Sequence, residues 1–204
     1  MAEKSIYLAS RSPRRRDLLK QIGIDFEMLL LRSDPRRGVD VDETPRPDEA
    51  PRAYAVRIAR TKAEAGARAL AMRGLRQKPV LAADTTVVLG GHIIGKPDDR
   101  EHAAQILAAL SGREHQVVSV VAMAHRDQLD DRVSVSTVWF RPISADEVRR
   151  YVETGEPLDK AGAYGIQGRA AAFVTRIDGS YSGIMGLPLA ETTELMQKFG
   201  IAVL

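Results

Sequence analysis

Three arginines follow a serine and a proline near the start of the chain, in the run Ser12-Pro13-Arg14-Arg15-Arg16. Serine is a preferred helix N-cap and proline a preferred first helical residue, so the arginines fall in the first turn of a predicted helix. Each cation there opposes the helix dipole by roughly 0.3 to 1 kcal/mol, and an anionic ligand would reverse that sign. Free amide groups and guanidinium groups at one helix end favour a phosphate site. The alternative is a solvated basic face.

A single aspartate interrupts the apolar run of residues 79–89. If the flanks form a buried strand, an unpaired carboxylate at Asp84 would cost several kcal/mol. The side chain must therefore be hydrogen-bonded, bound to a metal or exposed at a strand end. We interpret Asp84 as catalytic, and the alternative is an aspartate capped by Thr85 or Thr86 at a turn.

Other polar residues could complete such a site. The long loop between residue 31 and Pro51 holds the acidic cluster 40–43, which could bind a divalent cation or be solvated. Lys62, in the helix predicted over residues 50–72, points either into the site or into water. Lys96 ends a partial P-loop pattern that begins at Gly90, but Pro97 stands where a P-loop needs a hydroxyl ligand for magnesium. Lys96 can still bind phosphate on a different scaffold.

The elements that must position these residues follow from periodicity and turn signals, which predict an α/β fold. Strands are predicted over residues 5–9, 26–31, 79–89, 92–94, 115–124, 132–140 and 201–204. Helices are predicted over residues 13–22, 50–72, 98–110, 145–154 and 189–199. Because the two long strands after residue 114 are joined by a polar turn, we expect them to pair antiparallel in a mixed sheet. Residues 155–188 hold seven of the sixteen glycines, which indicates backbone shaped to approach a ligand or to turn sharply.

Composition excludes several classes of function. No apolar run reaches the roughly eighteen residues of a membrane span and the N-terminus lacks a signal pattern, so we expect a cytoplasmic protein with no membrane partner. The absence of cysteine excludes disulfides, thiolate zinc sites and a cysteine nucleophile. Any metal should be a hard cation on oxygen ligands. Basic residues are interleaved with acidic ones and aromatic residues make up only 5% of the chain, so we expect no nucleic-acid partner.

Five motifs carry a resemblance to a known family. They are Leu8-Ala9-Ser10-Arg11-Ser12-Pro13-Arg14-Arg15, Ala83-Asp84-Thr85, Gly95-Lys96-Pro97-Asp98, the run of residues 159–168, and Gly186-Leu187-Pro188-Leu189. In this order they resemble the Maf family, the so-called septum formation proteins, whose members are nucleoside triphosphate pyrophosphatases. The resemblance extends from residue 5 to about residue 200. It implies an elongated mixed β-sheet with surrounding helices and a cleft between two lobes, similar to inosine triphosphate pyrophosphatases. We therefore expect residues 1–204 to form one domain with two lobes around one cleft, and a homodimer is compatible with the resemblance.

The resemblance also implies a substrate and a set of site residues. Residues 159–168 are similar to the branch of the family that acts on dTTP and UTP. A glutamine amide can pair with two adjacent groups on the acceptor, donor, acceptor edge of uracil or thymine, which gives a physical reason for this branch. The resemblance makes Arg14, Thr85 and Gln167 the specificity residues and Asp84 the general base. The remaining polar positions of the predicted site are Ser12, Arg15, Glu43, Lys62 and Lys96.

The predicted reaction converts dTTP and UTP, or modified pyrimidine nucleotides, to the monophosphate and pyrophosphate in a nucleotide-pool house-cleaning role. Mg²⁺ or Mn²⁺, with Glu43 as the favoured ligand, would bridge the triphosphate while Asp84 takes a proton from the attacking water; Asp84 could instead be a metal ligand. The leaving pyrophosphate would be held by four cations, Arg14, Arg15, Lys62 and Lys96. One rival is a pyrophosphatase for 7-methyl-GTP or ITP-like triphosphates. Another is a nucleotide-binding regulator of cell division that acts through a protein partner.

Overall fold

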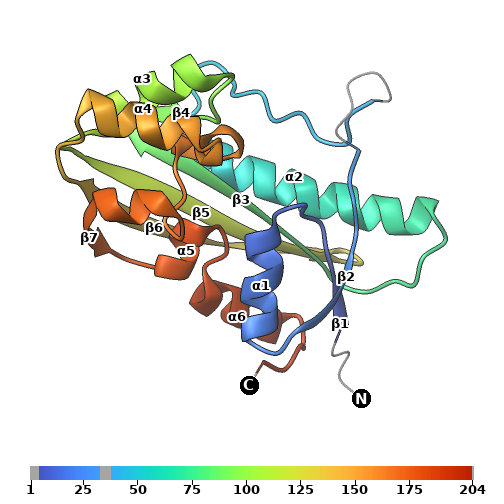
Figure 1. Ribbon diagram of the computed structural model, residues 1–204. Helices are drawn as coiled ribbons and strands as arrows, with labels where there is room; N and C mark the ends of the chain where they lie inside the picture. Colours follow the sequence, from blue (N-terminus) through green and yellow to red (C-terminus); the bar gives the residue numbers. More distant parts are fainter. Residues whose placement is uncertain (1–4, 33–37, 204) are drawn as a thin grey trace.

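Seven strands form one mixed sheet in the described part of the chain, residues 5–32 and 38–203 of a computed structural model (Figure 1). The strands are β1 (Ser5–Leu8), β2 (Asp25–Met28), β3 (Val80–Leu89), β4 (His92–Ile94), β5 (Glu114–His125), β6 (Gln128–Phe140) and β7 (Val174–Asp178). Their spatial order is β2-β1-β3-β5-β6-β7, and β4 pairs with β3 outside this path. Pairs β1–β2 and β1–β3 are parallel, whereas β3–β4, β3–β5, β5–β6 and β6–β7 are antiparallel. The predicted mixed sheet is confirmed.

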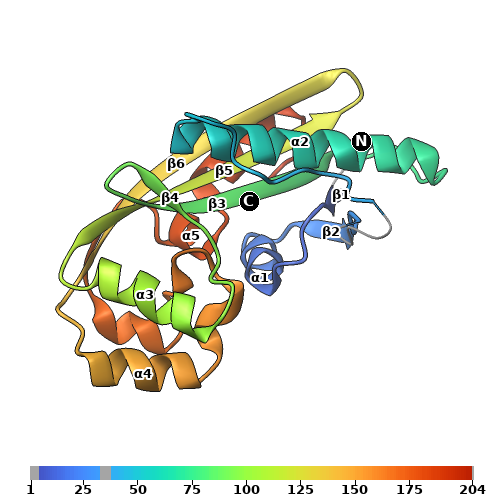
Figure 2. The same cartoon turned by 90° about the horizontal axis from the view of Figure 1, so that it is seen from above.

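Helices cover both faces of this sheet (Figure 2). They are α1 (Pro13–Gln21), α2 (Pro51–Met72), α3 (Arg100–Leu110), α4 (Ala145–Glu153), α5 (Tyr181–Met185) and α6 (Leu189–Lys198). Even-numbered residues of β3, such as Val80 and Ala82, pack in a cluster with α2. Odd-numbered residues, such as Leu81 and Ala83, pack in a second cluster shared with α1, α3, α4 and α6. Because side chains alternate along a strand, neighbouring residues of β3 serve opposite faces of the sheet. None of the helices in the described ranges is long and apolar enough to cross a membrane.

One edge of β3 is only partly covered. On its β1 side, β3 pairs with β1 at residues 80 and 81, and with β4 at residues 87–89. Between these two ladders, residues 82–86 pair only with β5 among the described residues. The gap lies where β1 ends, beside the first turn of α1. Side chains from both faces of β3 can therefore reach the same space at this edge.

Most predicted elements are present, with helix ends shifted by one or two residues. The expected strand at residues 201–204 is wrong for residues 201–203, which form no strand; Leu204 lies outside the described residues. Ile201 and Val203 are buried in the core instead, so their alternating pattern reflects burial without strand pairing. The glycine-rich region 155–188 contains elements that the pattern did not predict. They are three short 3₁₀ helices, the strand β7 and the short helix α5.

Candidate active site

A cleft of about 980 Å³ lies beside the open edge of β3. It is lined by residues from the β1–α1 junction, the loop before α2, α2 itself, β3, the loop after β4 and the glycine-rich region. All nine residues predicted for the site line it: Ser12, Arg14, Arg15, Glu43, Lys62, Asp84, Thr85, Lys96 and Gln167. The structure therefore brings together side chains that are up to 155 positions apart in the sequence.

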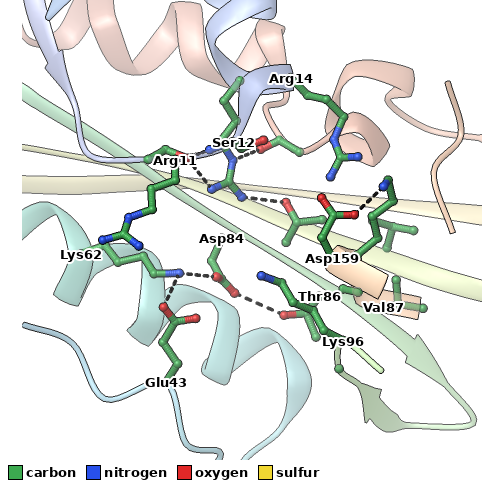
Figure 3. A pocket seen from close by; sticks show the side chains of 18 of the residues that line it. Arg11, Ser12, Arg14, Glu43, Lys62, Asp84, Thr86, Val87, Lys96 and Asp159 are labelled. Carbon is green, nitrogen blue, oxygen red and sulfur yellow. Dashed lines mark hydrogen bonds and ion pairs between the residues drawn. The ribbon is translucent and has the colours of Figure 1, made fainter. Parts of the chain in front are cut away.

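Asp84 lies in the middle of β3, on the face that packs against α2, and is only 8% exposed. The Lys62 ammonium donates to Asp84 Oδ1 at 2.9 Å, and the Thr86 hydroxyl donates to Oδ2 at 3.3 Å (Figure 3). These contacts supply the partners that a buried carboxylate needs. The alternative of an aspartate at a turn is wrong, since β3 continues through both Thr85 and Thr86.

Lys62 also contacts the acidic loop. Its Nζ lies 3.2 Å from Glu43 Oε1, so one ammonium group bridges the carboxylates of Glu43 and Asp84 (Figure 3). The side chains of Lys62 and Asp84 are 15% and 11% exposed, whereas that of Glu43 is 56% exposed. Lys62 thus points into the site, which answers the question that the sequence left open.

The two carboxylates fit a divalent metal ion of the Mg²⁺ or Mn²⁺ type. Both already converge on the ammonium group of Lys62, and carboxylate oxygens are the ligands that such hard ions prefer. Within residues 5–32 and 38–203, no group of three or more His, Cys, Asp or Glu side chains is arranged to hold a metal. The protein would therefore supply few ligands. This agrees with the usual way of binding Mg²⁺, through one or two carboxylates with water and substrate phosphates completing the shell.

Arg15 faces the opposite side of β3 from Asp84. Its guanidinium group donates to three oxygens: Gly186 O at 2.8 Å, Ser10 Oγ at 3.2 Å and Thr85 Oγ1 at 3.3 Å. Burial lowers the pKa of Arg15, and the charge of Asp84 opposes this effect. Arg15 therefore joins the end of β1, the middle of β3 and the end of α5 in one wall of the cleft. Its contact with phosphate stays a prediction.

Thr85 continues this wall into the sheet. Its hydroxyl lies 3.0 Å from Ser119 Oγ of β5, and Ser119 donates to Gly183 O at 2.6 Å. The adjacent residues Asp84 and Thr85 thus have different surroundings, an ion pair on one face and a hydroxyl network on the other. Ser119 gave no signal in the sequence, because nothing local marks it as a partner of Thr85.

Arg14 points into the cleft with part of its hydrogen-bonding capacity unused. Its Nε is buried and has no hydrogen-bond partner among the described residues. Figure 3 shows its guanidinium group directed toward Asp159. Burial raises the pKa of Asp159, but the hydrogen bond from Lys160 and the charges of Lys160 and Arg14 outweigh it and lower that pKa overall. Because Nε is buried, a ligand oxygen in the cleft would be met by the terminal nitrogens of the Arg14 guanidinium group.

Ser12, Lys96 and Gln167 are available to a ligand as well. Ser12 occupies the N-cap position of α1, but its side chain makes no capping hydrogen bond. Lys96 is exposed, and its side chain extends from the loop after β4 into the space near Asp84 and Thr86 (Figure 3). Gln167 is exposed in the turn before the 3₁₀ helix Arg169–Phe173.

Two glycines shape the backbone around Gln167, as the glycine-rich pattern predicted. Gly162 has a φ of +72°, and a Cβ there would lie 2.8 Å from Val87 Cγ2. A Cβ on Gly168 would lie 2.0 Å from Glu156 Oε1. At Gly162 the positive φ and the Val87 contact favour a residue without a side chain, whereas a Cβ at position 168 would require the Glu156 carboxylate to shift.

Sequence reasoning gave no site role to several residues that line the cleft, among them Arg11 and Tyr54. Arg11 donates to Leu31 O at 3.0 Å and lies above Lys62 in Figure 3. Thr86, which also lines the cleft, is expected from the sequence only as a possible cap of Asp84 at a turn; in the structure it does bond Asp84, but within β3, where residues two apart share a face. Tyr54 gave no such signal, since its position in the predicted helix is equally suited to core packing.

A family model described as Maf-like protein matches residues 5–199. A protein of Nitrosomonas europaea named dTTP/UTP pyrophosphatase is 58% identical over 202 residues, which cover 99% of this chain and 98% of the relative. A protein of Aromatoleum aromaticum with the same name is 58% identical over 196 residues, covering 96% of this chain and 95% of the relative.

Among solved structures, the Ham1 protein of Staphylococcus aureus matches with a TM-score of 0.49 at 20% identity, over 96% of this chain and 97% of that chain. A HAM1 protein from Coxiella burnetii matches with the same TM-score at 16% identity, over 96% of this chain and 100% of that chain.

Proposed function

Because the chain belongs to the Maf-like protein family, we propose that it is a nucleoside triphosphate pyrophosphatase that hydrolyses dTTP and UTP to the monophosphate and pyrophosphate. One observation carries the proposal: the open edge of β3 joins a buried carboxylate, several cations and an exposed glutamine in one cleft. Two relatives that are 58% identical to this chain are named dTTP/UTP pyrophosphatase, which supports the choice of substrate.

Asp84 is the group we assign as general base. A water molecule held at its carboxylate would lose a proton to Asp84 and attack the α-phosphorus, and the bond from that phosphorus to the bridging oxygen would break. Pyrophosphate would then leave. Lys62 and Thr86 each donate to one oxygen of Asp84, which gives the carboxylate one orientation in the structure. A general base of this kind contributes about 10² to 10⁴ in rate.

Glu43 and Asp84 would hold Mg²⁺ or Mn²⁺. When bound, such an ion neutralises phosphate charge and polarises the phosphoryl group. In the structure, both carboxylates are engaged by Lys62. Lys62 would therefore release at least one of them when the ion binds, and its ammonium group would become available to the phosphates.

The cations around the cleft stabilise charge that develops on the leaving pyrophosphate. Lys62 and Lys96 reach the space beside Asp84, and Arg14 points into the same cleft toward Asp159. Phosphoryl transfer depends mainly on such alignment and charge stabilisation. Arg15 contributes from behind, by holding Thr85 and the end of α5 in place.

The pyrimidine base would lie at the other end of the cleft, against the turn that carries Gln167. The amide of Gln167 can donate to a carbonyl oxygen of the base and accept from its N3–H group. Tyr164, which also lines this end, is fixed by a 2.9 Å hydrogen bond between its hydroxyl and His115 Nε2. This support keeps the turn rigid, and a rigid turn favours discrimination between bases.

A panel of triphosphates with product analysis tests this function. The purified protein is incubated with dTTP, UTP, ITP or 7-methyl-GTP in Mg²⁺ or Mn²⁺, and the products are separated by ion exchange. We expect monophosphate and pyrophosphate, with kcat/KM highest for dTTP and UTP. Faster turnover of 7-methyl-GTP or ITP would refute the assignment of Gln167. Tight nucleotide binding without pyrophosphate release would favour the regulator hypothesis.

A further inference from the structure

The segment that carries Glu43 has no regular secondary structure. We call residues 40–50 the acidic segment; its residues 41–45 line the cleft, and the segment leads into α2 (Figure 1). Glu43 is more than half exposed, so core packing does not fix its carboxylate. A carboxylate on an unsupported loop would be a poor ligand, because ordering the loop would cost conformational entropy on every binding event. Something else must hold this segment in place.

Arg57, in the second turn of α2, provides the strongest contact. Its Nε and Nη2 each donate to Glu49 at 2.6 Å in a bidentate pair, and Nη2 also donates to Thr44 O at 3.1 Å. The side chains of Arg57 and Glu49 are 18% and 10% exposed. The hydrogen bond from Arg57 lowers the pKa of Glu49 to about 2, so the pair stays charged at neutral pH. Planar, bidentate geometry fixes direction as well as distance.

Tyr54 contacts the backbone of Glu43 itself. Its hydroxyl donates to Glu43 O at 3.0 Å, and its ring lies under the guanidinium carbon of Arg57, 5.5 Å from the ring centroid. Burial, helped by the charges of Asp84 and Glu43, raises the pKa of Tyr54 to about 12. The hydroxyl therefore remains protonated and continues to donate. Tyr54 and Arg57 are three residues apart, which places them on the same face of α2.

The start of the acidic segment is fixed separately. The backbone N of Arg32 donates to Asp40 Oδ2 at 2.7 Å, and its Nε donates to Oδ1 at 2.9 Å. Glu43 thus lies between an anchor at Asp40 and two anchors on α2. Because α2 also carries Lys62, one rigid helix places both the acidic segment and the ammonium group that meets Glu43.

We propose that Tyr54 and Arg57 are positioning residues that hold the acidic segment so that the carboxylates of Glu43 and Asp84 can share one divalent cation. This inference rests on the proposed function, in which Glu43 is a metal ligand. Neither residue takes part in the chemical step. Their loss therefore weakens metal binding, and a high concentration of metal restores the rate.

The test measures Mn²⁺ affinity by electron paramagnetic resonance, in the presence of a dTTP analogue with a methylene group between the α and β phosphorus atoms. Arg57→Met removes the bidentate pair, and Tyr54→Phe removes one hydroxyl and keeps the ring. The matched control is Arg60→Met, on the same helix, because Arg60 pairs with Asp131 at 2.6 Å on the β6 side, away from the acidic segment. Glu49→Gln removes the acidic partner without changing α2 and replaces Arg57→Met if that variant does not fold.

We expect the Kd for Mn²⁺ to rise about tenfold in Arg57→Met and about threefold in Tyr54→Phe, and to stay unchanged in Arg60→Met. At saturating Mn²⁺, kcat for dTTP should return to within about twofold of wild type in both variants, whereas Glu43→Gln should not recover. The proposal is overturned if Arg57→Met binds Mn²⁺ as tightly as Arg60→Met does, or if Glu43→Gln leaves Mn²⁺ affinity unchanged. If the wild-type protein binds Mn²⁺ and the analogue but releases no pyrophosphate from dTTP, the proposed function is refuted. The Mn²⁺ affinities would still decide the role of Arg57.

Discussion

Replacing Lys62 with methionine should change metal binding and turnover in opposite directions. The methionine keeps an apolar stem in α2 but removes the ammonium group that bridges Asp84 and Glu43 at 2.9 and 3.2 Å. A metal ion that takes both carboxylates must displace these two ion pairs in the wild type. The pair with Asp84 is mostly buried and the pair with Glu43 is largely exposed, so we take their joint strength as about 2 kcal/mol. Without this competition, Lys62→Met should bind Mn²⁺ roughly thirtyfold more tightly in the absence of nucleotide.

The rate should fall at the same time, by roughly a hundredfold, because an ammonium group available to the phosphates is lost. Mn²⁺ affinity is measured by electron paramagnetic resonance and kcat by pyrophosphate release. Arg11→Met is the matched control, since it removes one positive charge from the same cleft. The Arg11 side chain donates to the backbone oxygen of Leu31 and not to either carboxylate. If Mn²⁺ bound to Lys62→Met no more tightly than to Arg11→Met, the two carboxylates would not be a shared metal site.

Three further predictions concern Arg15, which lines the cleft, and His115 and Gly168, which lie next to lining residues. Arg15→Met loses hydrogen bonds to three oxygens, which should cost about 3 kcal/mol and lower the melting temperature by roughly 6 to 12 °C in calorimetry; an unchanged melting temperature would refute the role of Arg15 as a cross-link. Burial lowers the pKa of His115 to about 4, so the unfolded chain takes up a proton first as the pH falls below about 6.5, and the native state should lose up to about 3 kcal/mol by pH 4. The denaturant midpoint of His115→Phe should fall less than that of the wild type as the pH is lowered. An equal fall in both proteins would exclude His115 as the source of the loss. Gly168→Ala places a Cβ 2.0 Å from Glu156 Oε1, so KM for dTTP should rise roughly tenfold with little change in kcat, and wild-type kinetics would show that the turn tolerates the shift.

The elements and the composition of the cleft could be predicted because their signals are local. The capping and periodicity of α1 place Ser12 and Arg14 at its first turn without knowledge of the fold. The interruption of an apolar strand by Asp84 can likewise be read from the local sequence of residues 79–89. Family motifs then identified which distant polar residues belong together, and all of them line one cleft.

The partners of these residues could not be predicted, because they depend on contacts between distant segments. Arg15 reaches Gly186 O across 171 positions. Asp84, on the opposite face of the sheet from Arg15, pairs with Lys62 of α2. The open edge of β3 is a matter of register: β1 and β4 cover the two ends of the strand and leave the middle free. Short elements such as β7 and α5 also escape periodicity, since each has only five residues.

The proposal that Asp84 drives pyrophosphate release is tested most directly by following the products of dTTP in the wild type and in Asp84→Asn. Asparagine fills the same space and can keep hydrogen bonds to Lys62 and Thr86, so the melting temperature should change little. We expect the wild type to release one monophosphate and one pyrophosphate per dTTP, and Asp84→Asn to lose roughly a thousandfold in kcat. Orthophosphate as the product of the wild type, or near-normal turnover by a folded Asp84→Asn protein, would contradict the account.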